Sequence, residues 1–277
     1  MFTGIVQGIA TVKALNDRPG LRSVSLSLPP RFTDGLQIGA SVSVDGVCLT
    51  VTSVGDGNAD FDVVLQSQSL TTLGVLRPGD RVNVERAARD GAEVGGHPLS
   101  GHIDFSASLT QIRTPPNNRV WRVNVAAPWM RYLFAKGYVA VNGASLTLAE
   151  VHREADGSGW FEVWLIPETL RNTTFGEKKA GAHLNVEIDR YTQVFVDSIR
   201  EAIHKEFSDL AHSMKFTDAA SIRRDSLQHS SGASLPTGGP GKMAMKKKAK
   251  KSGSGKLKSR GTGQPEGPHT KSPKKKK

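Results

Sequence analysis

The chain of 277 residues is long enough for two domains of ordinary size, each with its own hydrophobic core. Its formal net charge of +11 is unevenly distributed, because residues from position 211 onward hold 17 of the 37 basic residues but only 3 of the 26 acidic ones. The rest of the chain is therefore mildly acidic. This argues against a nucleic-acid-binding body and confines the basic character to the C-terminal tail.

The single cysteine, Cys48, excludes an intramolecular disulfide and indicates a reducing compartment. The segment Met1–Gln7 lacks the basic flank and the long apolar core of a signal peptide. No run of about 18 apolar residues occurs, so the sequence predicts no membrane span. Together these features predict a cytoplasmic protein without membrane contact.

One motif is written twice in the chain, as Val44–Val51 and again 97 positions later as Val141–Leu148. In both copies an apolar run meets an Asp-Gly or Asn-Gly pair, at Asp45 or Asn142, and continues as a second apolar run. That pattern is typical of a tight β-hairpin. Because flanking segments align as well, the repeat predicts two copies of one domain and paired sites.

The sequence of each copy predicts short strands separated by turn residues, with a short helical turn before the third strand. In the first copy the expected strands are Gly4–Leu15, Ser23–Leu28, Ser41–Val44, Cys48–Val54, Ala59–Leu65 and Arg81–Glu85. Six such strands predict a small closed antiparallel barrel. The expected fold class is all-β, with two tandem six-stranded Greek-key-like barrels, a C-terminal α-helix and a disordered Lys-rich tail.

The expected domains are an N-terminal barrel at 1–97, a C-terminal barrel at 98–191, a helix at 192–212 and the basic tail at 213–277. A narrow apolar seam predicts the helix, with Val196, Ile199, Ile203, Phe207 and Leu210 spaced by three or four residues. The seam would pack either on the chain's own barrel or against a helix of another subunit. From Ser213 the composition turns to Ser, Gly, Pro and Lys, which predicts an unfolded segment. The tail would attract a polyanion weakly or would be solvated without a specific role.

Polar side chains mark the second strand of each hairpin. Cys48 and Ser145 are equivalent positions, and Thr50 and Thr147 follow two residues later on the same strand face. This gives each copy a polar patch suited to a planar ligand that is rich in heteroatoms. No nucleophile, base and orienting residue can be combined from the spacing, so covalent catalysis is not indicated.

Two histidines lie near the start of the second copy. His97 and His102 are five positions apart and would point to opposite faces of a continuous strand, so no metal site is expected. His102 stands where the first copy has Ile5, and an exposed imidazole there could exchange protons. Glu168 of the second copy is equivalent to Gln66 of the first, so only the second copy has a carboxylate at this position.

These motifs resemble riboflavin synthase of the α-chain type, which is built of two tandem lumazine-binding barrels. The matching segments are Met1–Val6, Cys48–Val51, Gly95–His97, Gly101–Ile103, Ser145–Thr147 and Ile166–Leu170. The resemblance covers roughly residues 1–205 and leaves out the tail. It implies a transferase of riboflavin biosynthesis that exchanges a four-carbon unit between two molecules of 6,7-dimethyl-8-ribityllumazine. The products would be riboflavin and 5-amino-6-ribitylaminouracil, and no metal or organic cofactor is expected.

The resemblance also implies a homotrimer assembled through the C-terminal helix, with each active site between the barrels of two subunits. It implies that two pockets hold the two lumazine molecules. The residues expected in the first pocket are Gly4, Ile5, Val6, Cys48, Leu49, Thr50, Asp62, Val63, Val64, Leu65, Gln66 and Ser67. Those expected in the second are Gly101, His102, Ile103, Lys136, Ser145, Leu146, Thr147, Trp164, Leu165, Ile166, Pro167, Glu168 and Thr169.

The expected catalytic residues are His102, Ser145, Thr147 and Cys48. His102 with Ser145 or Thr147 would assist proton transfer at the acidic 7-methyl group of one substrate. Cys48 would lie beside the partner substrate, where a nucleophile adds at C7. The two copies must differ because one substrate donates carbon and the other accepts it, and the pairs Cys48/Ser145, Ile5/His102 and Gln66/Glu168 carry that difference.

The sequence departs from the family pattern at two places. Family members commonly have an acid at Asn142 and an amide at Asp45, and here the two are exchanged. They also commonly have Glu-Thr in place of Gln66-Ser67. Two alternatives stay open: a non-catalytic lumazine- or flavin-binding protein on the same fold, and a nucleic-acid-associated protein that acts through its tail.

Overall fold

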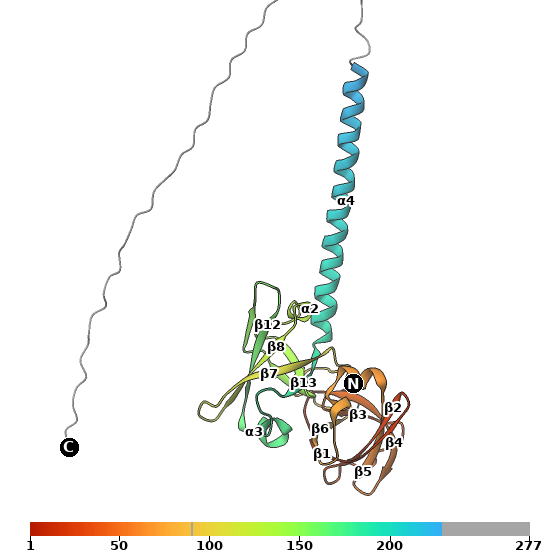
Figure 1. Ribbon diagram of the computed structural model, residues 1–277, viewed down its shortest axis with the longest axis vertical. Helices are drawn as coiled ribbons and strands as arrows, with labels where there is room; N and C mark the ends of the chain where they lie inside the picture. The colour runs from red at the N-terminus through yellow and green to blue at the C-terminus, as the bar shows by residue number, and fades with distance from the viewer. Residues whose placement is uncertain (90, 229–277) are drawn as a thin grey trace, which may run out of the picture. The chain divides into compact units, whose positions relative to one another are not determined.

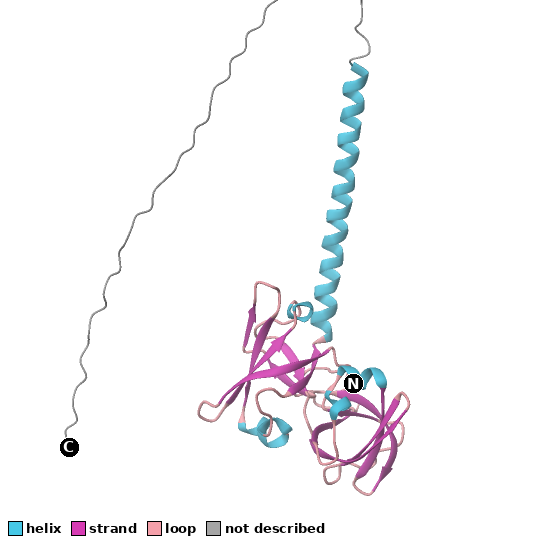
Figure 2. Ribbon diagram, in the orientation of Figure 1, coloured by secondary structure: helices cyan, strands magenta, loops and turns pink. Residues whose placement is uncertain are grey.

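The strands form two sets that follow each other along the chain, drawn red to orange and yellow to green in Figure 1. Figure 2 shows that strands dominate both sets and that short helices lie at their ends. The computed structural model describes residues 1–89 and 91–228, with side chains described as far as residue 212. The all-β class expected from the short alternating runs is confirmed.

The first set forms a closed antiparallel barrel in the order β1-β2-β5-β4-β3-β6, as predicted. Its strands are β1 (Gly8–Arg18), β2 (Leu21–Ser27), β3 (Ser41–Val44), β4 (Val47–Gly55), β5 (Asn58–Val64) and β6 (Arg81–Arg86). The first strand begins four residues later than expected, because Gly4 adopts a positive φ of 76° and turns the chain out of the sheet.

Alternating side chains build the core of this barrel. Along β4, Leu49 and Val51 are buried, whereas Cys48 is half-buried and Thr50 is exposed. Burying one such aliphatic side chain contributes about 1.5–3 kcal/mol. The strand's periodicity of two therefore supplies both the packing of the interior and the outward placement of the polar patch.

The second set repeats this order with one strand divided in two. Its strands are β7 (Phe105–Arg113), β8 (Arg119–Val125), β9 (Tyr138–Val141), β10 (Ala144–Thr147), β11 (Glu150–Arg153), β12 (Gly159–Leu165) and β13 (His183–Ile188). They form a seven-stranded sheet in the order β10-β9-β13-β7-β8-β12-β11. The expected tandem arrangement of two barrels is confirmed, with the difference that the second is an open sheet of seven strands and not a closed barrel of six.

The cause lies at Leu148 and Ala149, which separate β10 from β11 where the first copy has the continuous β4. Leu148 and Ala149 favour strands less than the Val-Thr-Ser run of the first copy. Their N–H groups still donate to the carbonyls of Gly137 and Glu162, at 2.9 and 2.8 Å. The two end strands of the sheet are thus the two halves of one divided strand.

The two predicted hairpin turns are confirmed, and they pack against each other. Asp45 and Asn142 both have φ of 43°, and the glycines after them also have positive φ, as a type I′ turn requires. A Cβ atom on Gly46 would lie 2.8 Å from the backbone nitrogen of Gly143. Only glycine fits at this contact between the two copies.

Short helices follow corresponding strands in the two copies. Helix α1 (Leu65–Leu70) and the 3₁₀ turn η1 (Thr72–Val75) come after β5, and α3 (Pro167–Asn172) and η2 (Thr174–Gly176) come after β12. In the second copy α2 (Ala127–Met130) precedes β9 and has Pro128 in its first turn, as expected.

The C-terminal helix α4 runs from Arg190 to Gln228. It begins within two residues of the predicted start but continues past Leu210. The prediction that structure ends near Ser213 is wrong for residues 213–228, and the rest of the expected basic tail lies outside the described residues. Within the described part of the chain, no helix has the length and apolar character needed to span a membrane.

Part of the helix contacts the second barrel. The Tyr132 hydroxyl donates to Asp197 at 2.7 Å, and Val196 packs on the barrel core. Other apolar residues of the predicted seam are exposed, with Ile203 at 51% and Phe207 at 68%. The seam is therefore only partly covered within one chain.

Candidate functional site

Two short segments cross between the barrels. Residues 2–6 precede the first barrel and residues 99–103 precede the second, and they are joined by a pair of 2.9 Å backbone hydrogen bonds between Phe2 and Leu99. Glu85 accepts from the N–H groups of Thr3 and Gly4, and Glu187 accepts in the same way from Ser100 and Gly101. Each segment is therefore fixed by a buried glutamate of the barrel that it leads into.

Each crossing segment then pairs with the hairpin of the other barrel. The Ser145 N–H donates to the Gly4 carbonyl at 2.8 Å, and the Cys48 N–H donates to the Gly101 carbonyl at 2.8 Å. A Cβ atom on Gly4 would lie 2.5 Å from Ser145 Cβ, and one on Gly101 would lie 2.6 Å from Cys48 Cβ. Both glycines also have positive φ. Glycine is therefore required at each position for two reasons, the backbone conformation and the lack of space for a Cβ atom.

This arrangement corrects the expected grouping of the pockets. Gly4–Val6 lies with Ser145 and not with Cys48, and Gly101–Ile103 lies with Cys48 and not with Ser145. Within one chain, His102 therefore belongs to the Cys48 side of the molecule. Ile5 therefore belongs to the Ser145 site, and His102 belongs to the Cys48 site.

The site at Ser145, called here the Ser145 site, is a hollow of about 170 Å³. Its walls include Gly4–Val6, Ser145, Ile166, Glu168 and Thr169. Ile5 and Ile166 are 48% and 55% exposed. Exposed aliphatic side chains beside convergent polar groups suit a flat heterocycle.

A buried histidine contacts the Ser145 hydroxyl. His97 Nδ1 lies 2.6 Å from Ser145 Oγ, and the imidazole stacks on Tyr138 with ring centroids 5.1 Å apart. Burial lowers the pKa of His97, with a smaller opposing effect of Asp189. The imidazole is therefore neutral at pH 7 and can either donate to the hydroxyl or accept from it.

The sequence places His97 in a segment that matches the family, but its contact with Ser145 was not predicted. The signal lay in the glycine before it. A Cβ atom on Gly96 would meet the Thr3 carbonyl oxygen at 2.2 Å and Ser145 Cβ at 2.7 Å. Gly96 therefore marks the place where the linker between the copies approaches the site.

Glu168 lies at the start of α3 on the rim of the Ser145 site. Arg171 donates to its carboxylate, and Asn172 Nδ2 donates to it at 2.6 Å. The hydrogen bond from Arg171, followed by that from Asn172, lowers the pKa of Glu168. The side chain is therefore an anion that accepts hydrogen bonds.

The second site, called here the Cys48 site, is formed by equivalent residues. Gly101–Ile103 lies against Cys48, and α1 carries Gln66 and Ser67 at the positions of Glu168 and Thr169. Ile103 packs on the core of the first barrel, and His102 is exposed. By equivalence with the Ser145 site, the Cys48 site would use the thiol of Cys48, the imidazole of His102 and the amide of Gln66, whereas the Ser145 site combines a hydroxyl, a buried imidazole and a carboxylate.

Several expected binding residues point into the barrels. Val63 and Leu165 are fully buried, and Leu49 and Leu146 are buried with them. These four side chains belong to the hydrophobic cores, so only their backbones can face a ligand. In contrast, Thr50 and Thr147 are exposed, and they share the outer strand face with Cys48 and Ser145, as expected from the spacing.

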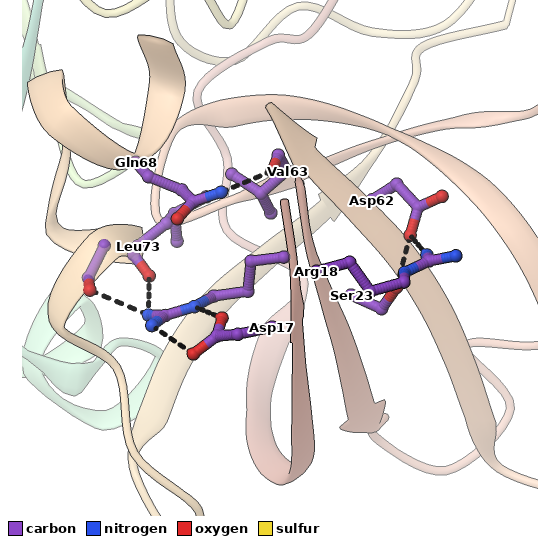
Figure 3. Close-up of polar contacts among 9 residues, drawn as sticks. Asp17, Arg18, Ser23, Asp62, Val63, Gln68 and Leu73 are labelled. Atoms are coloured by element: carbon purple, nitrogen blue, oxygen red, sulfur yellow. Dashed lines mark hydrogen bonds and ion pairs between the residues drawn. The ribbon is translucent and has the colours of Figure 1, made fainter. Parts of the chain in front are cut away.

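Asp62 lies on the outer face of β5 and is held by polar contacts (Figure 3). Ser23 Oγ donates to Asp62 at 2.6 Å and Arg18 donates at 3.2 Å. The neighbouring Val63 carbonyl accepts from Gln68 Nε2 at 2.8 Å, which ties α1 to the end of the strand. Trp164 takes the place of Asp62 in the second copy and is 50% exposed.

The remaining expected residues lie at strand ends. Lys136 has φ of 71° and its N–H donates to the Leu148 carbonyl at 2.7 Å, as Gly39 does to Val51 in the first copy. Val64 and Leu65 are exposed at the join of β5 and α1, and Pro167 opens α3. Among the described residues, no group of three or more His, Cys, Asp or Glu side chains is placed to hold a metal ion.

Comparison with known proteins agrees with this duplicated geometry. The model of the lumazine binding domain matches twice, at residues 3–87 and 100–189. Riboflavin synthase of Escherichia coli strain K12 is 44% identical over 204 residues, which is 73% of this chain and 93% of that protein. The chain belongs to the riboflavin synthase family. Riboflavin synthase of Chlamydia pneumoniae is 38% identical over 209 residues, 76% of this chain and all of that protein.

Solved structures show the same fold. The structure of LumP complexed with riboflavin matches with a TM-score of 0.60 at 23% identity, covering 69% of this chain and all of that one. LumP complexed with 6,7-dimethyl-8-(1'-D-ribityl) lumazine matches with a TM-score of 0.59 at 22% identity. The family's tandem lumazine-binding barrels are thus the architecture of this chain.

Proposed function

We propose that this chain is a riboflavin synthase. It transfers a four-carbon unit between two molecules of 6,7-dimethyl-8-ribityllumazine and yields riboflavin and 5-amino-6-ribitylaminouracil. The observation that carries this is the pair of related but unequal sites, at Cys48 and Ser145, in a chain of the riboflavin synthase family. A reaction between two identical molecules needs two similar pockets, and unequal roles need pockets that differ.

Binding two substrates face to face supplies much of the acceleration. Holding two reactants in a reactive orientation is worth on the order of 7–11 kcal/mol in favourable systems. In this chain the two sites of one molecule have different polar groups, so each would favour one of the two roles. Within one chain, His102 and Cys48 belong to one site, and Ser145 with the buried His97 belongs to the other.

The assembled active site joins the two sets of groups from different subunits. The Cys48 site of one subunit faces the Ser145 site of a neighbour, which brings His102 toward Ser145 and Thr147. His102 then assists proton transfer at the 7-methyl group, and Cys48 lies where a nucleophile adds at C7. The chemistry needs no cofactor, since both carbon fragments come from the substrates.

The partner is a second and a third copy of this chain. The exposed part of the α4 seam supports this assembly. Its apolar side chains are Ile199, Ile203, Phe207 and Leu210, each at least 42% exposed. An amphipathic helix with such a seam is stabilised by packing against equivalent helices. A homotrimer, expected from the family resemblance, satisfies this requirement.

A turnover assay tests the function directly. Purified chain mixed with the lumazine should produce riboflavin absorbance at a rate proportional to protein concentration. Tight lumazine binding without riboflavin would instead identify a non-catalytic lumazine- or flavin-binding protein on the same fold. Replacing His102 by Gln should lower turnover with lumazine binding kept, and an unchanged rate would dismiss the role given to His102.

The basic tail is assigned only a weak attraction to polyanions, and the protein is assigned to the cytoplasm. The proposed attraction to polyanions rests on the 17 basic residues from position 211 onward. Truncation at Ser213 should leave turnover unchanged and weaken retention on a polyanionic resin. Equal retention after truncation would remove any role for the tail in such binding.

A further inference from the structure

Two buried asparagines lie where the hairpin turns of the two barrels meet. Asn83 is on β6 of the first barrel and Asn185 is at the equivalent place on β13 of the second, and they are 1% and 0% exposed. Neither lines the Ser145 site or the Cys48 site. Both side chains nevertheless have a donor and an acceptor that are engaged by the other barrel.

Asn185 connects both walls of the Cys48 site, although it belongs to the second barrel. Its Nδ2 group donates to the Asp45 carbonyl at 2.9 Å, at the turn that precedes Cys48. Its Oδ1 atom accepts from the Thr72 N–H at 2.8 Å, and Nδ2 also donates to Thr72 Oγ1 at 2.9 Å. Thr72 follows α1, the helix that carries Gln66 and Ser67.

Asn83 makes the reciprocal connection to the Ser145 site. Its Nδ2 group donates to the Asn142 carbonyl at 3.0 Å, at the turn that precedes Ser145. Its Oδ1 atom accepts from the Thr174 N–H at 2.8 Å. Thr174 follows α3, the helix that carries Glu168 and Thr169.

We propose that Asn83 and Asn185 are crossed positioning residues, each of which sets the spacing between hairpin and helix in the site of the opposite barrel. This inference rests on the proposed function for its catalytic meaning, but its geometry does not depend on it. An apolar side chain of the same volume would fill the space. Only a planar amide supplies the donor for the turn carbonyl and the acceptor for the helix-end N–H at once.

The same junction explains why Asp45 and Asn142 can be exchanged relative to the family pattern. The Asp45 side chain accepts from the Asn83 N–H at 2.8 Å, and the Asn142 side chain accepts from the Asn185 N–H at 2.7 Å. Each position uses only an acceptor oxygen, which a carboxylate and an amide both have. Asn142 Nδ2 accordingly has no hydrogen-bond partner among the described residues.

The thiol of Cys48 provides a reporter for one of the two sites. It is the single cysteine of the chain and is half-buried, so its rate of reaction with an aromatic disulfide reports the Cys48 site alone. We expect Asn185→Ala to raise this rate about three- to tenfold, because the three hydrogen bonds that link the hairpin turn to Thr72 are lost. We expect Asn83→Ala, a substitution in Cys48's own barrel, to change it less than twofold.

Two threonine variants provide a second test in case the asparagine variants do not fold. Thr72→Val removes the hydroxyl that accepts from Asn185, whereas Thr174→Val removes a buried hydroxyl that has no partner within the described part of the chain. We expect Thr72→Val to raise the thiol rate and Thr174→Val to leave it unchanged. Equal effects of the two asparagine variants, or of the two threonine variants, would overturn the crossed arrangement. These rates need no substrate, so they are independent of whether the chain forms riboflavin.

Discussion

A neutral imidazole held against a hydroxyl distinguishes the Ser145 site from the Cys48 site at the scale of single residues. His97 is stacked on Tyr138 and buried, so protonation would place an unpaired charge in a poorly solvated position. Because burial lowers the pKa of His97, the native state is favoured above pH 6.5 and loses this contribution as pH falls below it. The imidazole is therefore available in its neutral form to exchange a hydrogen bond with the Ser145 hydroxyl at pH 7.

Replacing His97 by Gln tests this role. The amide of Gln can hydrogen-bond the Ser145 hydroxyl but cannot exchange a proton with it, so turnover should fall by about 10²-fold. Lumazine affinity should change little, because the hollow keeps its walls. Steady-state kinetics together with a fluorescence titration of lumazine measure the two effects separately. A loss of affinity with unchanged turnover would make His97 a packing residue.

The buried carboxyl of Asp45 makes the free energy of unfolding depend on pH. Burial raises the pKa of Asp45 to about 6, against a smaller opposing effect of Lys178. A raised pKa means that the native state prefers the protonated form, so ionisation costs stability as pH rises from about 4 to about 6, and the full cost persists above that. A difference of this size between the pKa values of the folded and unfolded states corresponds to roughly 2–3 kcal/mol of unfolding free energy.

Asp45→Asn should therefore become progressively more stable than the unmodified protein between pH 4 and pH 7, by roughly 2–3 kcal/mol in total. Chemical denaturation at several pH values measures the difference. Asn142→Asp, at the equivalent turn, should show a trend of opposite sign. A difference that stays constant with pH would contradict a buried, ionisable Asp45.

Much of the detail at this scale could not be predicted from the sequence. The outward placement of Cys48, Thr50, Ser145 and Thr147 follows from strand periodicity and was predicted. The contact between His97 and Ser145 was not, because it depends on how the linker between the copies folds back. Nothing in the spacing of those two residues encodes a distance in space.

The elements were more predictable than the contacts between them. The Asp-Gly and Asn-Gly turns and the alternating runs are local signals, and they placed the hairpins correctly. The crossing of residues 2–6 and 99–103 was missed because the repeat is symmetric: Ser145 could pair equally with Gly4 or with Gly101. Sequence alone cannot choose between these two partners, since both have the same local motif.

The end of α4 was missed for a different reason. The apolar seam stops at Leu210, but the following residues include good helix formers, and the next glycine or proline is Gly232. Loss of amphipathic periodicity marks the end of packing, and not always the end of a helix. The helix accordingly continues to Gln228.

A pair of glycine substitutions tests the crossing segments. Gly101 has φ of 77° and no room for a Cβ, whereas Gly20 has φ of 75° and nothing within 4 Å. Gly20→Ala should cost about 1–2 kcal/mol from backbone strain alone. Gly101→Ala should cost more and should weaken lumazine binding, because the methyl group displaces Cys48. Equal stability and equal binding of the two variants would contradict the packing of residues 99–103 on the hairpin.

For the whole molecule, duplication supplies two sites and divergence makes them unequal. The duplicated barrels, the all-β class and the family could be read from repeated motifs. The distribution of groups between the sites could not, because the entry segments are exchanged between barrels. In the proposed mechanism, His102 and Ser145 belong to different sites of one chain and would meet at the proposed contact between subunits.

The mass balance of the reaction tests whether this chain catalyses the dismutation. The full chain incubated with 6,7-dimethyl-8-ribityllumazine alone should consume two molecules of it for each riboflavin and each 5-amino-6-ribitylaminouracil formed, as resolved by chromatography. No added cofactor should be needed. Lumazine that is bound but recovered unchanged, or riboflavin formed without the pyrimidine product, would contradict the dismutation.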